Sequence, residues 1–342
     1  MNKQHNYNTL DDYLKAKYNK KVFKVALNGD FTCPNRDGSI STGGCIFCSS
    51  EGSGEFAGTR GAPLCEQFKQ VKDIISLKWP DSLYIAYFQA NTNTYGPISK
   101  LKKLYYEAIN LDPNIVALSI ATRPDCLDDD VINLLSSINK IKPVWVELGL
   151  QTTNEKTAGL INRGYKNDVF YDAVKRLRSH NIDVIIHIIN GLPYETNTDM
   201  LNTINDLNKL DIQGIKIHSL YVLKNTPLEK MYLDNMFNLM SLDEYVNITA
   251  KQLELLNPSI VIHRISGDAP KDSLVAPLWG LKKFVVMNEL DKYMRQYNIR
   301  QGDKYHKRQE WLFLPFFIIS IYRYLVFYLL PLYTQHYLLF WK

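Results

Sequence analysis

The chain has 342 residues, enough to bury a large core in one barrel-sized domain or in two smaller ones. Its formal net charge of +5 is mildly basic, which is compatible with a nucleic-acid partner and does not by itself demonstrate one. Residues 1–21 are polar and charged, unlike a secretory signal, and five cysteines are an odd number, so a secreted disulfide framework is excluded and a reducing cytoplasm is expected.

Six short apolar runs, rich in Val, Ile and Tyr, have the pattern of strands that are buried on both faces. They lie at 22–27, 83–88, 115–120, 143–150, 183–189 and 214–220. Amphipathic helical patterns separate them at 64–78, 98–110, 128–139, 167–180 and 196–210. This alternation predicts a parallel sheet with helices outside, either an open doubly wound sheet or an incomplete barrel. Further on, we expect a strand with a turn at 262–268 and a basic amphipathic helix at 277–298.

The loop after the first strand, residues 31–56, contains three of the five cysteines: Cys33, Cys45 and Cys48. It is rich in Gly, Ser, Thr, Asn and Asp, so it can wrap around a bound group. Two residues separate Cys45 from Cys48, a spacing that can place two thiolates on one metal or cluster. In a barrel, chemistry sits at the carboxyl ends of the strands, which is where this loop begins.

Three local cysteines are one fewer than structural zinc sites and ordinary ferredoxin-type clusters use. Three thiolates would hold three irons of a [4Fe–4S] cluster and leave the fourth iron open, and S-adenosylmethionine is the leading candidate for that position. The spacing leaves two alternatives open. One is zinc completed by a histidine, and the other is a set of thiols that bind no metal. The candidate histidines are His187, His218 and His263.

The cysteine loop resembles that of radical S-adenosylmethionine (radical SAM) proteins. More narrowly, it is similar to the YhcC-type branch, which is related to the radical SAM domain of the Elongator catalytic subunit. The resemblance rests on CPNRDG at 33–38 and GGCIFC at 43–48. It implies an α/β fold with a partial (β/α)6 barrel of TIM type and a C-terminal helical extension. We therefore expect a core barrel at 1–240 with its cluster loop at 31–56, an extension of the core at 241–309, and an atypical tail at 310–342.

Four further residues are expected to bind the cofactor, on the same resemblance. In radical SAM proteins the end of the second strand contacts the methionine amino group, which here implicates Gln89 in the run FQANTNTY. A Gln that ends strand four and an Arg twelve residues later resemble a cofactor-holding pair, which places Gln151 at the ribose and Arg163 at the methionine carboxylate. Phe47, beside the last cysteine, is expected to pack near the adenine.

Several other polar residues stand out. Asn91 and Tyr194 depart from the branch, which has Tyr and Gly at these positions. Glu147 lies inside an apolar strand on the same side as Gln151, and a buried acid needs a partner or a role. Arg123 and Asp125 flank a proline, so they predict either an ion pair or a site. His187 and His218 lie on apolar strands, which is more typical of core histidines than of catalysts.

The segment 311–333 is apolar and aromatic over 23 residues, long enough to span a bilayer. Arg323 at its centre would cost roughly 2.5–3.5 kcal/mol on insertion scales, and two prolines interrupt it. Three interpretations stand: a tail anchor in contact with the membrane, an interfacial segment, or an extension from a frameshifted reading frame, which is slightly favoured.

The resemblance implies a cytoplasmic enzyme in which one electron from the reduced cluster cleaves S-adenosylmethionine, and the resulting 5′-deoxyadenosyl radical abstracts hydrogen from the substrate. The related Elongator domain suggests modification of the wobble uridine of tRNA, with flavodoxin or ferredoxin as electron donor. A peptide or small-molecule substrate is the runner-up. A hypothesis of a different class is a non-enzymatic zinc or iron–sulfur module, which a fourth thiolate from Cys65 or Cys126 would favour.

Overall fold

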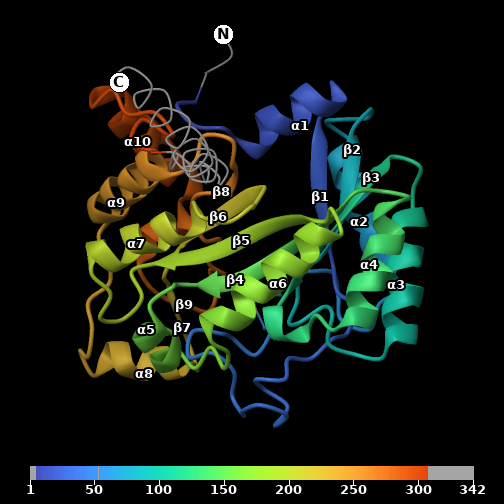
Figure 1. The fold of residues 1–342 in the computed structure, drawn as a ribbon, viewed down its shortest axis with the longest axis horizontal. Coiled ribbons are helices and arrows are strands. Elements are labelled where there is room, and N and C mark those ends of the chain that lie inside the picture. Colours follow the sequence, from blue (N-terminus) through green and yellow to red (C-terminus); the bar gives the residue numbers. More distant parts are fainter. Residues whose placement is uncertain (1–4, 53, 307–342) are drawn as a thin grey trace, which may run out of the picture. The chain divides into compact units, whose positions relative to one another are not determined.

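A computed structural model describes residues 5–52 and 54–306 of the chain. Its central element is a seven-stranded sheet with the strand order β1–β2–β3–β4–β5–β6–β8, and every neighbouring pair is parallel. Figure 1 shows the strands side by side, twisting into an open, partial barrel. The strands are β1 (Val22–Leu27), β2 (Leu83–Phe88), β3 (Ile115–Thr122), β4 (Val144–Gln151), β5 (Asp183–Asn190), β6 (Gly214–Ser219) and β8 (Val261–Arg264).

Helices connect consecutive strands and cover the outer face of the sheet (Figure 1). These connecting helices are α2 (Leu64–Ser76), α3 (Ile98–Asn110), α4 (Asp129–Asn139), α6 (Asn167–Ser179) and α7 (Asn197–Leu207). Their apolar faces explain their formation, and some have capping residues that fix where they begin. In α7, for example, Thr196 and Asp199 form a reciprocal capping box. The parallel α/β partial barrel expected from the sequence is confirmed, with element limits that agree to within a few residues.

Side chains along each strand point alternately toward the helices and toward the interior of the barrel. On β4, Val146, Leu148 and Leu150 belong to the main apolar core under the helices. Glu147 and Gln151 point the other way and line an interior cavity. This arrangement follows from the two-residue period of a strand. The near-continuous apolar runs of the sequence thus include a small number of polar side chains that face the barrel interior.

One prediction in the C-terminal region is confirmed and one needs correction. The strand expected with a turn at 262–268 is present as β8 at Val261–Arg264. It joins the main sheet beside β6 as a seventh strand, a neighbour that its four residues did not indicate. The helix expected at 277–298 is divided into a 3-10 turn, η2 (Leu278–Leu281), and α10 (Lys283–Gln296), because the backbone of Lys282 leaves the helical region at φ −114°, ψ 61°.

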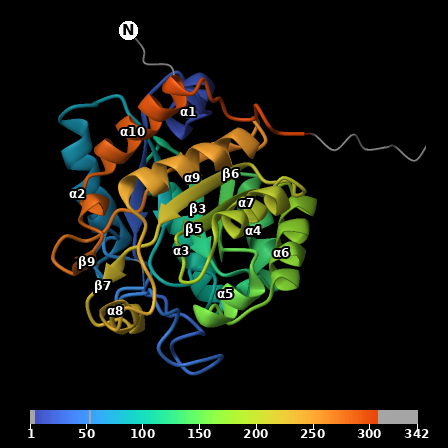
Figure 2. The same cartoon turned by 90° about the vertical axis from the view of Figure 1, so that its left-hand side faces the viewer.

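The remaining elements surround this barrel. They are α1 (Leu10–Tyr18), α5 (Glu155–Leu160), α8 (Pro227–Leu233), α9 (Leu242–Leu255) and a small antiparallel pair, β7 (Val222–Leu223) with β9 (Leu274–Ala276). Figure 2 shows α10 beside α9, with which it is in contact. In both views the long loop after β1 lies at the same end of the molecule as α5 and α8.

The described residues up to Tyr305 form one compact unit. The expected boundary near residue 240 stays a prediction. The expected tail at 310–342, with its membrane contact at 311–333, lies outside the described residues. Within 5–52 and 54–306, the structure contains no helix that is both long enough and apolar enough to cross a membrane.

Candidate active site

A cavity of about 230 Å³ lies inside the barrel, between the long loop after β1 and the inward-facing side chains of the strands. All seven residues expected to bind the cluster or the cofactor line it. These are Cys33, Cys45, Phe47, Cys48, Gln89, Gln151 and Arg163. Asn91 lines the cavity as well. The structure therefore brings together residues from the first loop, from the ends of β2 and β4, and from the connection after α5. Their individual roles stay predictions.

The cysteine loop folds through tight turns that hold the three thiols near one another. The amide of Cys48 donates to the carbonyl oxygen of Cys45 over 3.0 Å. Gly44 adopts φ +80°, a conformation that glycine reaches without strain, and a side chain there would press against Arg36 at 3.0 Å. The GGC run thus has a local reason: the backbone must turn sharply just before Cys45.

The environment of the thiols fits an iron–sulfur cluster. A hydrogen bond with the Cys48 thiol, burial, and the nearby Cys33 raise the pKa of Cys45 well above its usual value, while Arg123 opposes this. When all three groups are thiolates, cationic iron offsets their mutual repulsion. The Asn35 amide also approaches the Cys45 sulfur, at 3.7 Å, and hydrogen bonds to sulfur are among the features that tune such clusters.

None of the ligands considered for the alternatives joins the three cysteines in a metal site among the described residues. Cys65 is exposed on α2, and the Cys126 thiol donates to Asp125 at 3.8 Å; neither lines the cavity. His187 donates to Glu147, His218 stacks obliquely on His187, and His263 lies 3.5 Å from the Lys24 ammonium. Among the residues of 5–52 and 54–306, no three His, Cys, Asp or Glu side chains are placed to hold a single metal ion. In a [4Fe–4S] cluster, each thiolate binds its own iron.

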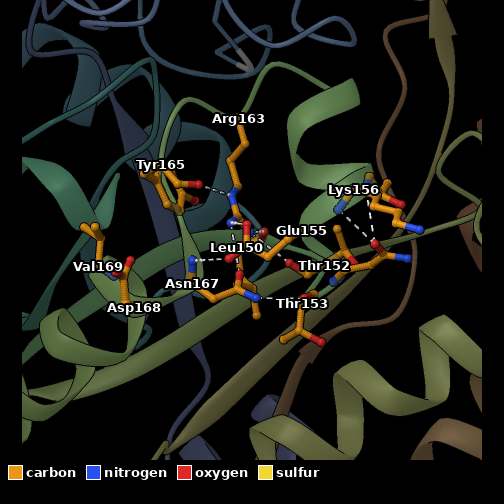
Figure 3. A network of polar contacts seen from close by, with 12 residues as sticks. Leu150, Thr152, Thr153, Glu155, Lys156, Arg163, Tyr165, Asn167, Asp168 and Val169 are labelled. Atoms are coloured by element: carbon orange, nitrogen blue, oxygen red, sulfur yellow. Dashed lines mark hydrogen bonds and ion pairs between the residues drawn. The ribbon is translucent and has the colours of Figure 1, made fainter.

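Arg163 is held by the protein itself, as Figure 3 shows. Its side chain is 1% exposed. All five of its N–H groups have partners: the carbonyl oxygens of Leu150, Thr152 and Tyr165, and the side chains of Glu155 and Asn167. With all its N–H groups bonded among the described residues, the guanidinium fixes the chain between β4 and α6. Its expected bond to the methionine carboxylate stays a prediction.

This connection in turn contacts the cysteine loop. The amide of Asn162 donates to the carbonyl oxygen of Gly44 over 2.8 Å, and the amide of Asn35 donates to the carbonyl oxygen of Asn162 over 2.6 Å. The backbone N–H of Ile46 bonds to the carbonyl of Ile161 over 3.1 Å. Sequence reasoning missed Asn35 and Asn162. Asn162 has φ 53°, a left-handed conformation that asparagine tolerates, so an Asn before Arg-Gly was the available signal.

Arg123 is the better candidate to bind an anion at this end of the cavity. It forms the ion pair with Asp125 that the sequence suggested, through Nε at 2.9 Å and Nη2 at 2.7 Å. Nη1 donates to the carbonyl of Arg163 over 2.9 Å. Two of its five N–H groups have no partner among the described residues, and the side chain lines the cavity. Its fork remains available to a carboxylate.

A network of buried charges lies deeper in the barrel. The Glu147 side chain is fully buried and accepts hydrogen bonds from four donors: Lys24, Lys216, His187 at 2.7 Å and Ser119 at 2.6 Å. Burial acts to raise the pKa of Glu147, but Lys216, Lys24 and His187 outweigh it and hold that pKa well below its usual range. His187 is thus a satisfied core histidine, as expected, although it also lines the cavity.

The two lysines of this network were not anticipated. Lys24 lies on β1 and Lys216 on β6, each within an otherwise apolar strand. A lysine inside a buried strand is itself a signal, because lysine is almost never fully buried unless it is paired. Only the closure of the sheet shows that both lysines reach the same carboxylate.

Comparison with known proteins identifies the class to which this geometry belongs. The model of the radical SAM superfamily matches residues 37–207, and the model of the radical SAM C-terminal domain matches residues 212–296. The chain belongs to the radical SAM superfamily, whose members are enzymes that use a [4Fe–4S] cluster and S-adenosylmethionine.

Two relatives show which branch of the superfamily the chain belongs to. The chain is 44% identical to protein YtqA of Bacillus subtilis over 309 residues, which cover 90% of this chain and 96% of that protein. It is 34% identical to protein YhcC of Escherichia coli K12 over 288 residues, or 84% and 92% of the two chains. The expected YhcC-type branch is confirmed.

Two further likenesses are more distant. Over 188 residues the chain is 25% identical to the tRNA uridine(34) acetyltransferase of Methanocaldococcus jannaschii, which covers 54% of this chain and 34% of that enzyme. The solved structure of Elp3 from Methanocaldococcus infernus superimposes with a TM-score of 0.62 at 18% identity, covering 82% of this chain and 64% of that one. The latter likeness supports the fold.

Proposed function

We propose that this radical SAM enzyme modifies a uridine at the wobble position of tRNA. The enzymatic part of this proposal rests on one cavity. It is lined by Cys33, Cys45 and Cys48 together with Gln89 and Gln151. Support for the substrate comes from the likeness to a tRNA uridine(34) acetyltransferase over about half of this chain, together with the net charge of +5. A basic protein attracts the phosphate backbone of tRNA.

The three loop thiols would hold the cluster. When bound, the cluster and S-adenosylmethionine supply radical chemistry that removes a hydrogen atom from the substrate. Reduction of the cluster requires an external one-electron donor such as flavodoxin or ferredoxin. Asn35 and Asn162 position the loop, and Arg163 holds the segment that carries Asn162.

Four side chains would orient the cofactor. Gln89 follows β2 and Gln151 ends β4, and both line the cavity with amides suited to the methionine amino group and the ribose hydroxyls. Arg123 offers two unpaired N–H groups to the methionine carboxylate, in place of Arg163. Phe47 lies at the edge of an apolar cluster and offers a flat face to the adenine.

The test is anaerobic. The protein is reconstituted with iron and sulfide, reduced with dithionite and given S-adenosylmethionine, and 5′-deoxyadenosine is quantified. We expect deoxyadenosine that is lost in Cys45→Ala and is stimulated by a tRNA transcript with uridine at position 34. A matched transcript with cytidine at position 34 is the control.

The outcomes separate the enzyme from its substrate. Formation of deoxyadenosine without any difference between the two transcripts would refute the wobble-uridine assignment and favour a peptide or small-molecule substrate. No cleavage in protein that carries four irons would contradict the catalytic assignment itself.

A further inference from the structure

The inner end of the cavity has an unusual charge balance. We use "inner end" for the part formed by Glu147, His187, Lys216 and His218, all of which line the cavity. Glu147 is a single negative charge, yet the ammonium groups of both Lys24 and Lys216 bond to it. When both lysines are protonated, the network carries one positive charge too many.

Among the described residues, Glu147 is the only acid that acts on the pKa of Lys216, so no second carboxylate there supplies the missing negative charge. Burial lowers the pKa of His187 to about 4, and it lowers the pKa of His218 and of His263 well below the usual value, so these rings are neutral near pH 7. Arg264, next to Lys216 in the sheet register, is already paired with Asp268 at 3.3 Å. An uncompensated buried charge is costly, so proteins retain one where a ligand or a proton change can offset it.

Two hydrogen-bond donors at the inner end are also unused. Lys216 donates to Glu147 and to the Tyr87 hydroxyl at 3.1 Å, which leaves its third N–H without a partner among the described residues. His218 Nε2 is buried and has no partner in the described part of the chain. Unsatisfied buried polar atoms are rare and call for an explanation such as a bound ligand. Both atoms belong to residues that line the same cavity.

We propose that the inner end binds a singly charged anionic group of the substrate, a carboxylate, with Lys216 and His218 as its direct partners. This inference rests on the proposed function, because it places the group on the molecule that this enzyme modifies. A carboxylate matches the surplus of one charge, whereas a phosphate monoester carries about −1.5 to −2. A backbone phosphodiester is also singly charged, and we choose the carboxylate because a base can carry it. Its two oxygens can accept one hydrogen bond each from Lys216 Nζ and His218 Nε2.

The arrangement separates two anion sites within one cavity. Arg123 lies with the cysteine loop, bound to the carbonyl of Arg163. Lys216 lies within β6, paired in register with His187 of β5 and Arg264 of β8. The substrate carboxylate would therefore occupy a position distinct from that of the methionine carboxylate. A uridine substrate would carry the acidic group on the base that is modified.

Two matched ligands test this. Binding of 5-carboxymethyluridine and of its neutral amide, 5-carbamoylmethyluridine, is measured by anaerobic calorimetry on the reconstituted holoenzyme with S-adenosylmethionine. A hydrogen-bonded charge predicts that the carboxylate binds roughly 10- to 100-fold more tightly than the amide. Lys216→Met should bring this ratio close to one, and Lys216→Arg, which keeps the charge, should largely restore it.

A lysine outside the cavity provides a control for the Lys216 variants. Lys142→Met removes an ammonium that donates to the carbonyl of Ile109 away from the cavity, and it should leave the ratio unchanged. Iron content and melting temperature establish that each variant is folded. If Lys216→Met does not fold, His218→Leu replaces it, with a smaller fall in the ratio expected. An equal ratio in the wild type and in these variants overturns the proposal.

A different binding result is expected if the substrate is not a uridine. If neither uridine binds the wild-type holoenzyme, the substrate class is wrong, and the anion site is judged with acetate against acetamide. Greater thermal stabilisation by acetate that disappears in Lys216→Met would still support the site. Equal shifts with the two compounds, or an acetate effect that survives in the variant, would refute it.

Discussion

The side-chain amide of Asn162 donates to the main-chain carbonyl of Gly44 over 2.8 Å and thereby joins the connection after β4 to the loop that carries the three cysteines. Asn35 returns a bond of 2.6 Å from that loop to the carbonyl of Asn162. The two asparagines thus link segments that lie 118 positions apart in the sequence. These two bonds therefore hold the loop around Cys45 against the connection that follows β4.

Replacing Asn162 should loosen the cysteine loop. Asn162→Gly keeps the left-handed backbone at φ 53° but removes the bond to Gly44, while Asn162→Ala removes the bond and adds backbone strain. We expect both variants to lose iron faster than the wild type when treated with a chelator, and Asn162→Ala to be less stable than Asn162→Gly by about 1 kcal/mol. Iron release and urea unfolding measure the two effects. If both variants retain iron as well as the wild type does, Asn162 does not hold the cysteine loop in place.

The two arginines should differ in what their loss affects. Arg163→Met removes a buried cation with five hydrogen bonds, and we expect the free energy of unfolding to fall by about 3–5 kcal/mol. Arg123→Met should have a smaller effect on stability and should weaken S-adenosylmethionine binding roughly tenfold or more, since a charged hydrogen bond is lost. Urea unfolding and equilibrium binding separate the two roles. Weak binding by a fully stable Arg163→Lys would instead identify Arg163 as the direct ligand.

Lys216 should make stability depend on pH. Burial lowers its pKa to about 7; Lys24 and Arg264 act in the same direction and Glu147 opposes them. The unfolded chain, with a lysine pKa near 10.4, binds more protons between pH 7 and 10, so stability should rise with pH across that window and stay level below it. Lys216→Met should lack this rise. The groups facing Lys216 are Tyr87, Glu147, His187, His218, Lys24 and Arg264.

The same titration should govern binding of the substrate carboxylate. The proposed anion site needs a protonated Lys216, so affinity for 5-carboxymethyluridine should fall about tenfold per pH unit above pH 7. Lys216→Arg stays charged and should give a flat profile. Calorimetry from pH 6 to 9 provides the comparison, with the neutral amide as the reference ligand. A flat profile in the wild type would argue against Lys216 as the ligand.

Tyr194 should be a site where glycine is better than the native residue. Its backbone adopts φ 65°, and its side chain is 62% exposed, so little packing compensates for the strain. Tyr194→Gly should raise the free energy of unfolding by up to about 1 kcal/mol, because glycine adopts this conformation without a clash. Tyr194→Ala keeps the strain and is the matched control. Equal stability of the two variants would show that the backbone there is not strained.

Much of the fold was readable from the sequence because its signals are local. Continuous apolar runs identified β1 to β6, and amphipathic spacing identified the helices between them. The spacing of Cys33, Cys45 and Cys48 pointed to a cluster with an open iron, and the family comparison confirms the class of cofactor. β8 was not placed in the sheet, since four residues carry too little pattern to reveal their neighbour.

The partners of the site residues were decided by tertiary structure alone. Nothing in the sequence shows that Lys24 and Lys216, on the first and sixth strands, meet at Glu147 on the fourth, because that depends on how far the sheet curls. The guanidinium of Arg163 looked available until the carbonyls of the turn around it were in place. Local patterns determine which residues form strands and which face inward. Hydrogen-bond satisfaction and charge balance instead depend on the folded partial barrel, where side chains distant in sequence share one small volume.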